Sequence, residues 1–189
     1  MKNHYDIPKI NITVPENYKE LVKPLDKERL LCYNLPDDVL YSLTHTGLPL
    51  NQSFDFNANI SITFCEFPTV KRYPYLQHDY LYFASMEEMG ELSIDLHSRD
   101  VFQYVDKYMP HSLVNSSIEK FIESLGLWLS FYPQLQDYVQ EMYEENPYFS
   151  LFEDDKMLKL MENKIKELDP YSMKYQKFFW RRMCEPDIF

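Results

Sequence analysis

Glycine is scarce in this chain, with Gly47, Gly90 and Gly126 as its three occurrences in 189 residues. Loops that bind phosphate need clustered glycines, because the backbone must approach the anion closely. Three isolated glycines cannot build a P-loop or a dinucleotide-binding fingerprint. The composition therefore argues against nucleotide-dependent chemistry through the common motifs, and no other pattern in the chain indicates a cofactor.

Cysteine and long apolar runs are sparse too. Cys32, Cys65 and Cys184 are widely spaced and none belongs to a C-x-x-C pair, so the sequence supports neither a disulfide framework nor a zinc knuckle. No apolar run approaches the roughly 20 residues that a membrane-spanning helix needs. Residues 1–6 lack the apolar segment of a signal peptide. We therefore expect a soluble, cytoplasmic protein with unpaired thiols and no membrane contact.

Clustered metal ligands are also missing. None of the five histidines lies in an H-E-x-x-H or H-x-H arrangement, so a metal site would need ligands from distant segments. His97 and Asp95 would share one face of a strand, which would allow a pH-sensitive pair. His78 has Asp79 as its neighbour. We favour the interpretation of His97 as a surface histidine in a turn, close to a solvated aspartate.

The candidate nucleophiles lack the motifs that would activate them. No G-x-S-x-G elbow surrounds Ser116 or Ser117, and Cys65 has no base near it in the sequence. We assign no catalytic residue and expect no enzymatic activity. The alternative, a small hydrolase, would require His97, Asp95 or Cys65 to converge in one pocket.

What the chain does contain is alternation of apolar and polar residues, which is typical of β-strands. Strands of this kind are predicted at residues 60–64, 92–96 and 101–105. Another is predicted at residues 80–84, which are too apolar for one side to face solvent. A short helix is predicted before them, because Pro36, Asp37 and Asp38 suit a first helical turn and Gly47 suits a helix end.

A capped amphipathic helix is predicted from residue 116. Ser116 and Glu119 have the spacing of a capping box, and apolar residues recur every three or four positions from Ile118 to Tyr132. Pro133 should stop or kink this helix.

The remainder of the chain favours helices. Residues 134–146 predict one, and residues from Asp155 onward predict another with Met157, Leu158, Met161, Ile165 and Leu168 on one side. Asp169 and Pro170 are residue types that commonly occur at the start of a helix, as the N-cap and the first helical residue. A last helix is therefore predicted there, anchored by Phe179 and Trp180.

These elements predict an α+β fold with a central antiparallel sheet of about four to six strands flanked by helices, and a helical C-terminal region. We expect a single domain over residues 1–189. Residues 1–34 would be an N-terminal extension, and residues 134–189 would be helices packed on the same domain.

Acidic residues outnumber basic ones, and the excess is uneven. The net charge is −11, and residues 134–169 carry ten Asp/Glu against four Lys/Arg. Such a chain should repel nucleic acid and anionic membranes and attract a basic partner, although acidity also keeps a tyrosine-rich protein in solution. Like charges at helical spacing destabilise a helix, so the cluster near residue 140 is either a solvated face or a docking surface. The residues predicted to bind a partner are Asp137, Tyr138, Glu141, Tyr143, Glu144 and Glu145.

Three segments in order resemble the SUKH superfamily of bacterial immunity proteins, specifically its fourth subgroup. They are Thr46-Gly-Leu-Pro49, the block from Gly90-x-Leu-x-Ile-Asp95 through Val101 to Val114-Asn-Ser-Ser-Ile-Glu-Lys-Phe-Ile-Glu-Ser-Leu125, and Leu168-Asp-Pro170 with Phe179-Trp180. The resemblance covers about residues 35 to 183. The first thirty residues match nothing in the family's pattern.

The resemblance implies a sheet flanked by helices and a small cytosolic protein that binds and blocks a cognate toxin without catalysis. Toxins of such systems are often nucleases or other enzymes that modify nucleic acid, and many are basic. The alternative is a regulatory protein–protein interaction module on the same fold with a non-toxin partner. Whether the protein is a monomer or a homodimer stays open.

Overall fold

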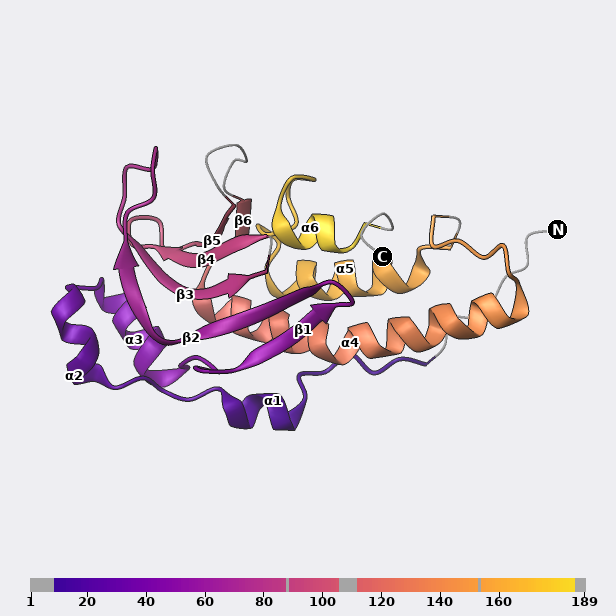
Figure 1. Ribbon diagram of the computed structural model, residues 1–189, viewed down its shortest axis with the longest axis horizontal. Coiled ribbons are helices and arrows are strands. Elements are labelled where there is room, and N and C mark those ends of the chain that lie inside the picture. Colours follow the sequence, from indigo (N-terminus) through magenta and orange to yellow (C-terminus); the bar gives the residue numbers. More distant parts are fainter. Residues whose placement is uncertain (1–8, 88, 106–111, 153, 186–189) are drawn as a thin grey trace.

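The computed structural model describes residues 9–87, 89–105, 112–152 and 154–185 (Figure 1). The first helices are α1 (Glu16–Leu21), α2 (Lys27–Leu30) and α3 (Asp37–His45), with a 3-10 turn at Leu31–Tyr33. The strands are β1 (Ser53–Asn57), β2 (Ile60–Lys71), β3 (Tyr80–Met86), β4 (Gly90–Asp95), β5 (Val101–Tyr104) and β6 (Ser112–Asn115). The later helices are α4 (Ile118–Glu145), α5 (Lys156–Leu168) and α6 (Phe179–Met183).

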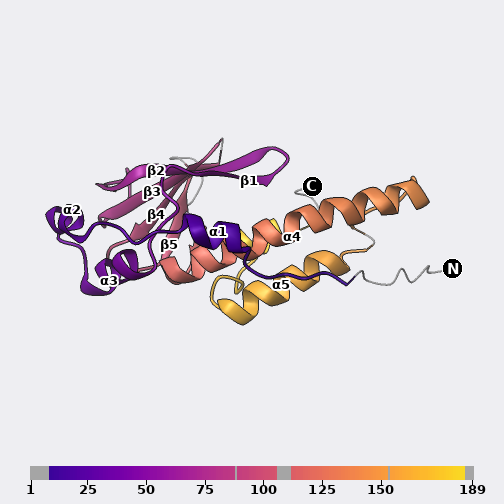
Figure 2. The same cartoon turned by 90° about the horizontal axis from the view of Figure 1, so that it is seen from below.

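The six strands form one antiparallel sheet in which each strand pairs with the next along the chain, β1 to β6. The sheet curls, and α4 lies across one of its faces (Figures 1 and 2). Phe64 of β2 and Phe83 of β3 contact Phe121 of α4, with ring centroids 6.4 and 5.4 Å apart. The prediction of an α+β fold with an antiparallel sheet of four to six strands is therefore confirmed.

The two edge strands, β1 and β6, were not predicted. They have five and four residues, and β1 contains Asp55 and Asn57, types that are depleted in strands. Tertiary contacts account for both. Trp128 Nε1 of α4 donates a hydrogen bond to the carbonyl of Phe56, and Ser112 Oγ donates to the carbonyl of Lys177 at 2.9 Å.

Aromatic side chains fill the centre of the core. Trp128 is fully buried and stacks on Phe56, with centroids 4.7 Å apart and planes 9° from parallel. Trp180 and Phe179 of α6 complete the group, at 5.7 and 5.5 Å from the Phe56 ring. Aromatic rings bury large apolar areas, so β1, α4 and α6 are held by one cluster.

Helix α4 continues through Pro133, so of the two predicted outcomes, a stop or a kink, the stop does not occur. The helix has 28 residues, including Pro133, and α5 packs beside its middle part (Figure 2). Proline inside a helix costs about 3 kcal/mol. The buried rings of Phe131 and Tyr132 and the buried Leu135 lie on either side of it, and their packing offsets that cost.

The helix cap is Ser117 and not the predicted Ser116. Ser117 Oγ accepts a hydrogen bond from the backbone N–H of Lys120 at 3.3 Å. Ser116 Oγ donates instead to Asp169 Oδ1 at 3.0 Å. The capping box with Glu119 therefore does not form.

Asp169 ends α5 and does not begin the last helix, which corrects that prediction. Its side chain is fully buried and accepts hydrogen bonds from Asn115 Nδ2 at 3.1 Å and from the backbone N–H of Ser116 at 2.7 Å. Asn115 Oδ1 in turn accepts from Trp180 Nε1 at 2.7 Å. The predicted anchors Phe179 and Trp180 are buried as expected, but their helix, α6, begins only at Phe179.

The N-terminal residues pack on α4. The Tyr18 hydroxyl donates to the carbonyl of Ile122 at 3.0 Å, and Asn11 exchanges backbone-to-side-chain hydrogen bonds with Gln134 at 3.1 Å. A Cβ on Gly126 would lie 2.6 Å from Val14 Cγ1, so glycine allows this close approach. No helix in the described part of the chain is long and apolar enough to cross a membrane.

Candidate partner-binding surface

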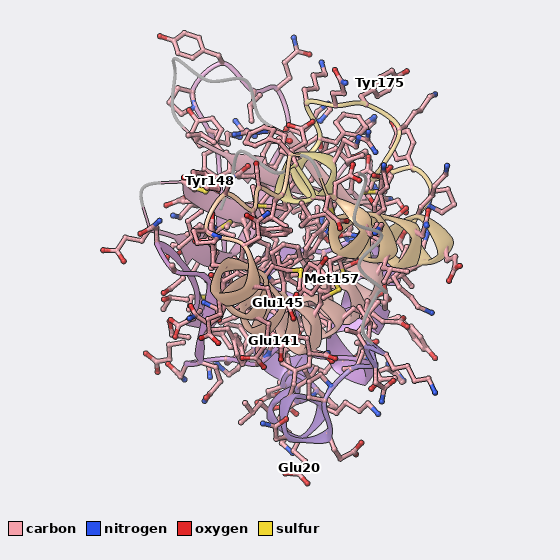
Figure 3. The ribbon with its side chains drawn as sticks, turned by 90° about the vertical axis from the view of Figure 1, so that its right-hand side faces the viewer. Glu20, Glu141, Glu145, Tyr148, Met157 and Tyr175 are labelled. Atoms are coloured by element: carbon pink, nitrogen blue, oxygen red, sulfur yellow. The ribbon has the colours of Figure 1, made fainter. Side chains whose placement is uncertain are left out.

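The distal half of α4 extends past the sheet and packs on α5 and on the loop that joins the two helices (Figures 1 and 2). The predicted partner-binding residues lie here. The carboxylates of the group, Asp137, Glu141, Glu144 and Glu145, are exposed to solvent. Figure 3 looks at the molecule from the side where α4 ends and labels Glu141 and Glu145. We call these four residues the acidic stripe. Asp137, Glu141 and Glu145 repeat every four residues and so share one side of the helix.

The described residues of the protein do not neutralise the acidic stripe. Residues 121–155 contain eight Asp/Glu and no Lys, Arg or His. No ion pair in the described part of the chain includes a residue of the stripe. Negative charges also lie at the negative end of the helix dipole, where the last turn has no basic residue. The stripe therefore destabilises its own helix and generates a negative potential that a cationic partner would relieve.

Exposed aromatic residues lie beside the end of the helix. Tyr143, Tyr148 and Phe152 are 48%, 90% and 71% exposed, and we call them the aromatic cluster. The chain turns after α4, and Phe149 folds back so that its ring makes edge contacts with Tyr138 and Tyr143, 5.9 and 5.8 Å between centroids. Tyrosine and phenylalanine at an accessible site are the types that anchor protein interfaces.

Tyr138 lies beneath this surface and not on it. It is 4% exposed, and its hydroxyl donates to Asp154 Oδ2 at 3.3 Å. Its role is to hold the α4–α5 loop in place. Tyr148 and Phe152 were not singled out from the sequence, although their position just after the helix break at Asn146 and beside acidic residues was a usable signal.

A pocket of about 280 Å³ opens on the other side of the distal helix. It is formed by α4, the β1–β2 turn and the loop before α5. Its lining residues are Asn57, Ala58, Asn59, Tyr132, Leu135, Gln136, Val139, Tyr143, Ser150, Leu151 and Phe152. Because Tyr143 and Phe152 belong to the aromatic cluster as well, the pocket and the cluster are continuous.

The histidines next to Asp95 form a structural cluster. His78 Nδ1 lies 3.0 Å from Asp95 Oδ2, and Asp95 Oδ1 accepts from the backbone N–H of His97 at 2.7 Å. Asp95 is 5% exposed, which corrects the expectation of a solvated aspartate. Asp79, which follows His78 in the sequence, forms an ion pair with Arg72, and Arg72 Nε lies 2.5 Å from Asp79 Oδ1.

The pKa of Asp95 is set by two opposing effects. Burial raises it, but the hydrogen bonds from His78 and from the N–H groups of His97 and Ser98 outweigh burial, so the pKa lies below its ordinary value. A carboxylate that stays ionised to hold a turn is a structural feature. His97 itself is exposed, as expected for a turn histidine.

The residues of the alternative hydrolase do not converge. In the described part of the chain, no hydrogen bond or ion pair joins Cys65 to Asp95 or His97. Burial raises the pKa of the Cys65 thiol to about 11, which suppresses the thiolate needed for nucleophilic attack. Ser116 and Ser117 are engaged with Asp169 and Lys120. Among the described residues, no three His, Cys, Asp or Glu side chains could together hold a metal ion.

The chain matches a known protein family over most of its length. A family model described as SUKH-4 immunity protein matches residues 22–186. No curated protein and no solved structure matches the chain. The matched range includes the sheet, helices α4 to α6 and all the residues that line the pocket, whereas α1 lies before it.

Proposed function

Because the chain belongs to the SUKH-4 immunity protein family, we propose that it neutralises a cognate bacterial toxin in the cytoplasm by tight, non-catalytic binding. The observation that carries this proposal is the acidic stripe beside the aromatic cluster. The acidic stripe offers charges that have no ion partner among the described residues, and the aromatic cluster offers rings that are exposed to solvent. Both features weaken a free protein and strengthen a complex.

The charge of this surface indicates the charge of the partner. A protein with a net charge of −11 attracts a basic protein and accelerates its association. Enzymes that act on nucleic acid present basic surfaces to phosphates. We therefore propose a basic toxin, of which a nuclease is one kind, whose substrate surface would be covered by the acidic stripe.

Co-expression tests this function directly. We expect cells that produce the toxin encoded beside this gene to grow when the protein is co-produced, and the two chains to elute together in gel filtration. Glu141→Lys/Glu145→Lys should weaken protection, whereas the matched double variant Glu20→Lys/Glu66→Lys, with the same charge change on α1 and β2, should protect. If the wild-type protein neither protects nor forms a complex, the proposed function is wrong.

A further inference from the structure

A second hollow adjoins the pocket at the β1–β2 turn. It has a volume of about 340 Å³ and shares Asn57, Ala58, Asn59, Tyr132 and Gln136 with the first pocket. Together the two hollows form a groove that runs over the turn. We call this the turn groove.

The two ends of the turn groove differ in chemistry. One end is walled by the apolar side chains of Leu135, Val139 and Leu151. The other end includes the carboxylates of Asp55 and Glu87, both exposed to solvent. An occupant that fits both ends must therefore carry an apolar group and a positive charge.

No cation in the described part of the chain pairs with the acidic end. Asp55 accepts a hydrogen bond from Ser61 Oγ at 3.1 Å, and no ion pair in the described part of the chain includes Asp55 or Glu87. The segments that form the groove, residues 51–70, 80–87 and 121–155, contain no Lys, Arg or His. Nucleic acid and other anions would be repelled from this site.

The turn groove is held in shape before anything binds. The Tyr132 hydroxyl accepts a hydrogen bond from the backbone N–H of Ala58 at 2.8 Å. Asn57 is buried, and its Oδ1 accepts from the N–H of Asn59 at 2.9 Å. These bonds fix the β1–β2 turn against α4. A preformed site reduces the ordering cost of binding.

The size of the apolar end fits one large side chain. Cavities of about 150 Å³ accept benzene, so a pocket of about 280 Å³ has room for a single aromatic or large aliphatic side chain with some backbone. Such a pocket is the usual seat of an interface anchor.

We infer that the turn groove takes an anchor segment of the toxin, in which a large apolar side chain enters the pocket and a neighbouring Lys or Arg pairs with Asp55 and Glu87. This inference rests on the proposed function and assigns the groove a role apart from that of the acidic stripe. Val139 and Glu141 lie on opposite sides of α4, because a step of two residues turns the helix by about 200°. The stripe therefore steers the toxin, and the groove retains it.

Kinetics separate these two roles. With the toxin domain encoded beside this gene, Val139→Trp, which fills the pocket, and Asp55→Lys/Glu87→Lys should each raise the dissociation rate at least tenfold and change the association rate by less. The matched control Glu20→Lys/Glu66→Lys should leave the dissociation rate unchanged. Circular dichroism would establish that every variant is folded. If dissociation stays at the wild-type rate while the toxin is still neutralised, the groove assignment is overturned and the proposed function stands.

A peptide probe tests the groove without the toxin. In an NMR titration, Ac-Gly-Phe-Lys-Gly-NH2 should shift the amide signals of Ala58, Val139 and Leu151, and Ac-Gly-Phe-Glu-Gly-NH2 should shift them much less. Val139→Trp should abolish the effect. Equal responses to both peptides, or shifts elsewhere on the molecule, would refute the groove assignment whatever the co-expression experiment shows.

Discussion

At the scale of the residue, two of the segments that carry the family resemblance are joined by buried hydrogen bonds between their polar side chains. Asp169 and Asn115 are 54 positions apart, yet their side chains bond to each other at 3.1 Å, and Trp180 bonds to Asn115. An Asp-Pro pair is typical of a helix start, so the local sequence predicted a cap at Asp169. Local patterns cannot register a partner that distant, and this explains why the role of Asp169 was predicted wrongly.

Replacing Asp169 tests this network. Asp169→Asn keeps the shape but places an amide donor where the carboxylate accepts bonds from Asn115 and Ser116. We expect a loss of about 3 kcal/mol in the free energy of unfolding, because a buried polar group would be left unsatisfied. Urea denaturation measures it. Asp137→Asn, an exposed control, should change stability by less than about 0.5 kcal/mol, and an equal midpoint for both variants would contradict the prediction.

Asp95 should make stability depend on pH at the acid end. Its pKa is lowered in the folded protein, so its contribution is complete above the ordinary carboxyl pKa of about 3.9 and is lost as the pH falls through the lower folded value. We expect Asp95→Asn to lose stability at pH 7 and to show a shallower decline below pH 4 than the wild type. Thermal unfolding across pH 2.5–7 checks this. Asp100→Asn serves as the neighbouring control, because burial raises the pKa of the Asp100 carboxyl group instead of lowering it.

At the scale of the element, α4 combines the main support of the fold with the proposed binding surface. Its first half was predicted from its apolar stripe and its second half from a separate pattern, because Pro133 appeared to divide them. The structure joins them into one helix. Proline removes a single hydrogen bond, and the buried side chains on either side of it outweigh that loss. The acidic stripe was visible in the sequence, whereas the turn groove was not, since its walls come from β1, α4 and the α4–α5 loop.

Neutralising the acidic stripe should have opposite effects on stability and on binding. Glu141→Gln/Glu145→Gln removes a repulsive pair four residues apart and a charge at the negative end of the helix dipole, worth about 0.5–1 kcal/mol together. We expect a more stable protein that associates with the toxin more slowly. Differential scanning calorimetry and stopped-flow mixing measure the two quantities. The double control Glu20→Gln/Glu66→Gln removes the same total charge elsewhere, and a matching rate loss there would mean that net charge alone sets the rate.

At the scale of the whole molecule, the sheet was predictable because its middle strands alternate between apolar and polar residues or, in β3, form a short apolar run. The edge strands were not, because β1 and β6 are short and depend on contacts with Trp128 and the α6 region. The first thirty residues were expected to match nothing in the family's pattern, but the family match begins at residue 22 and so includes the last of them. Tyr18 nevertheless belongs to the same buried cluster as α4 to α6, so these residues contribute to the common core.

The whole molecule's charge yields the last prediction. A net charge of −11 produces a field that extends about 10 Å at 0.1 M salt and about 3 Å at 1 M. Raising the salt from 0.02 to 0.5 M should therefore slow association with the basic toxin by about 10- to 100-fold. The dissociation rate should change far less, because the turn groove retains the toxin through short-range contacts. Stopped-flow fluorescence at four salt concentrations measures both rates. An association rate independent of salt would show that the acidic stripe does not steer the partner. A dissociation rate that rises in proportion to salt would show that ion pairs, and not the apolar end of the turn groove, hold the complex together.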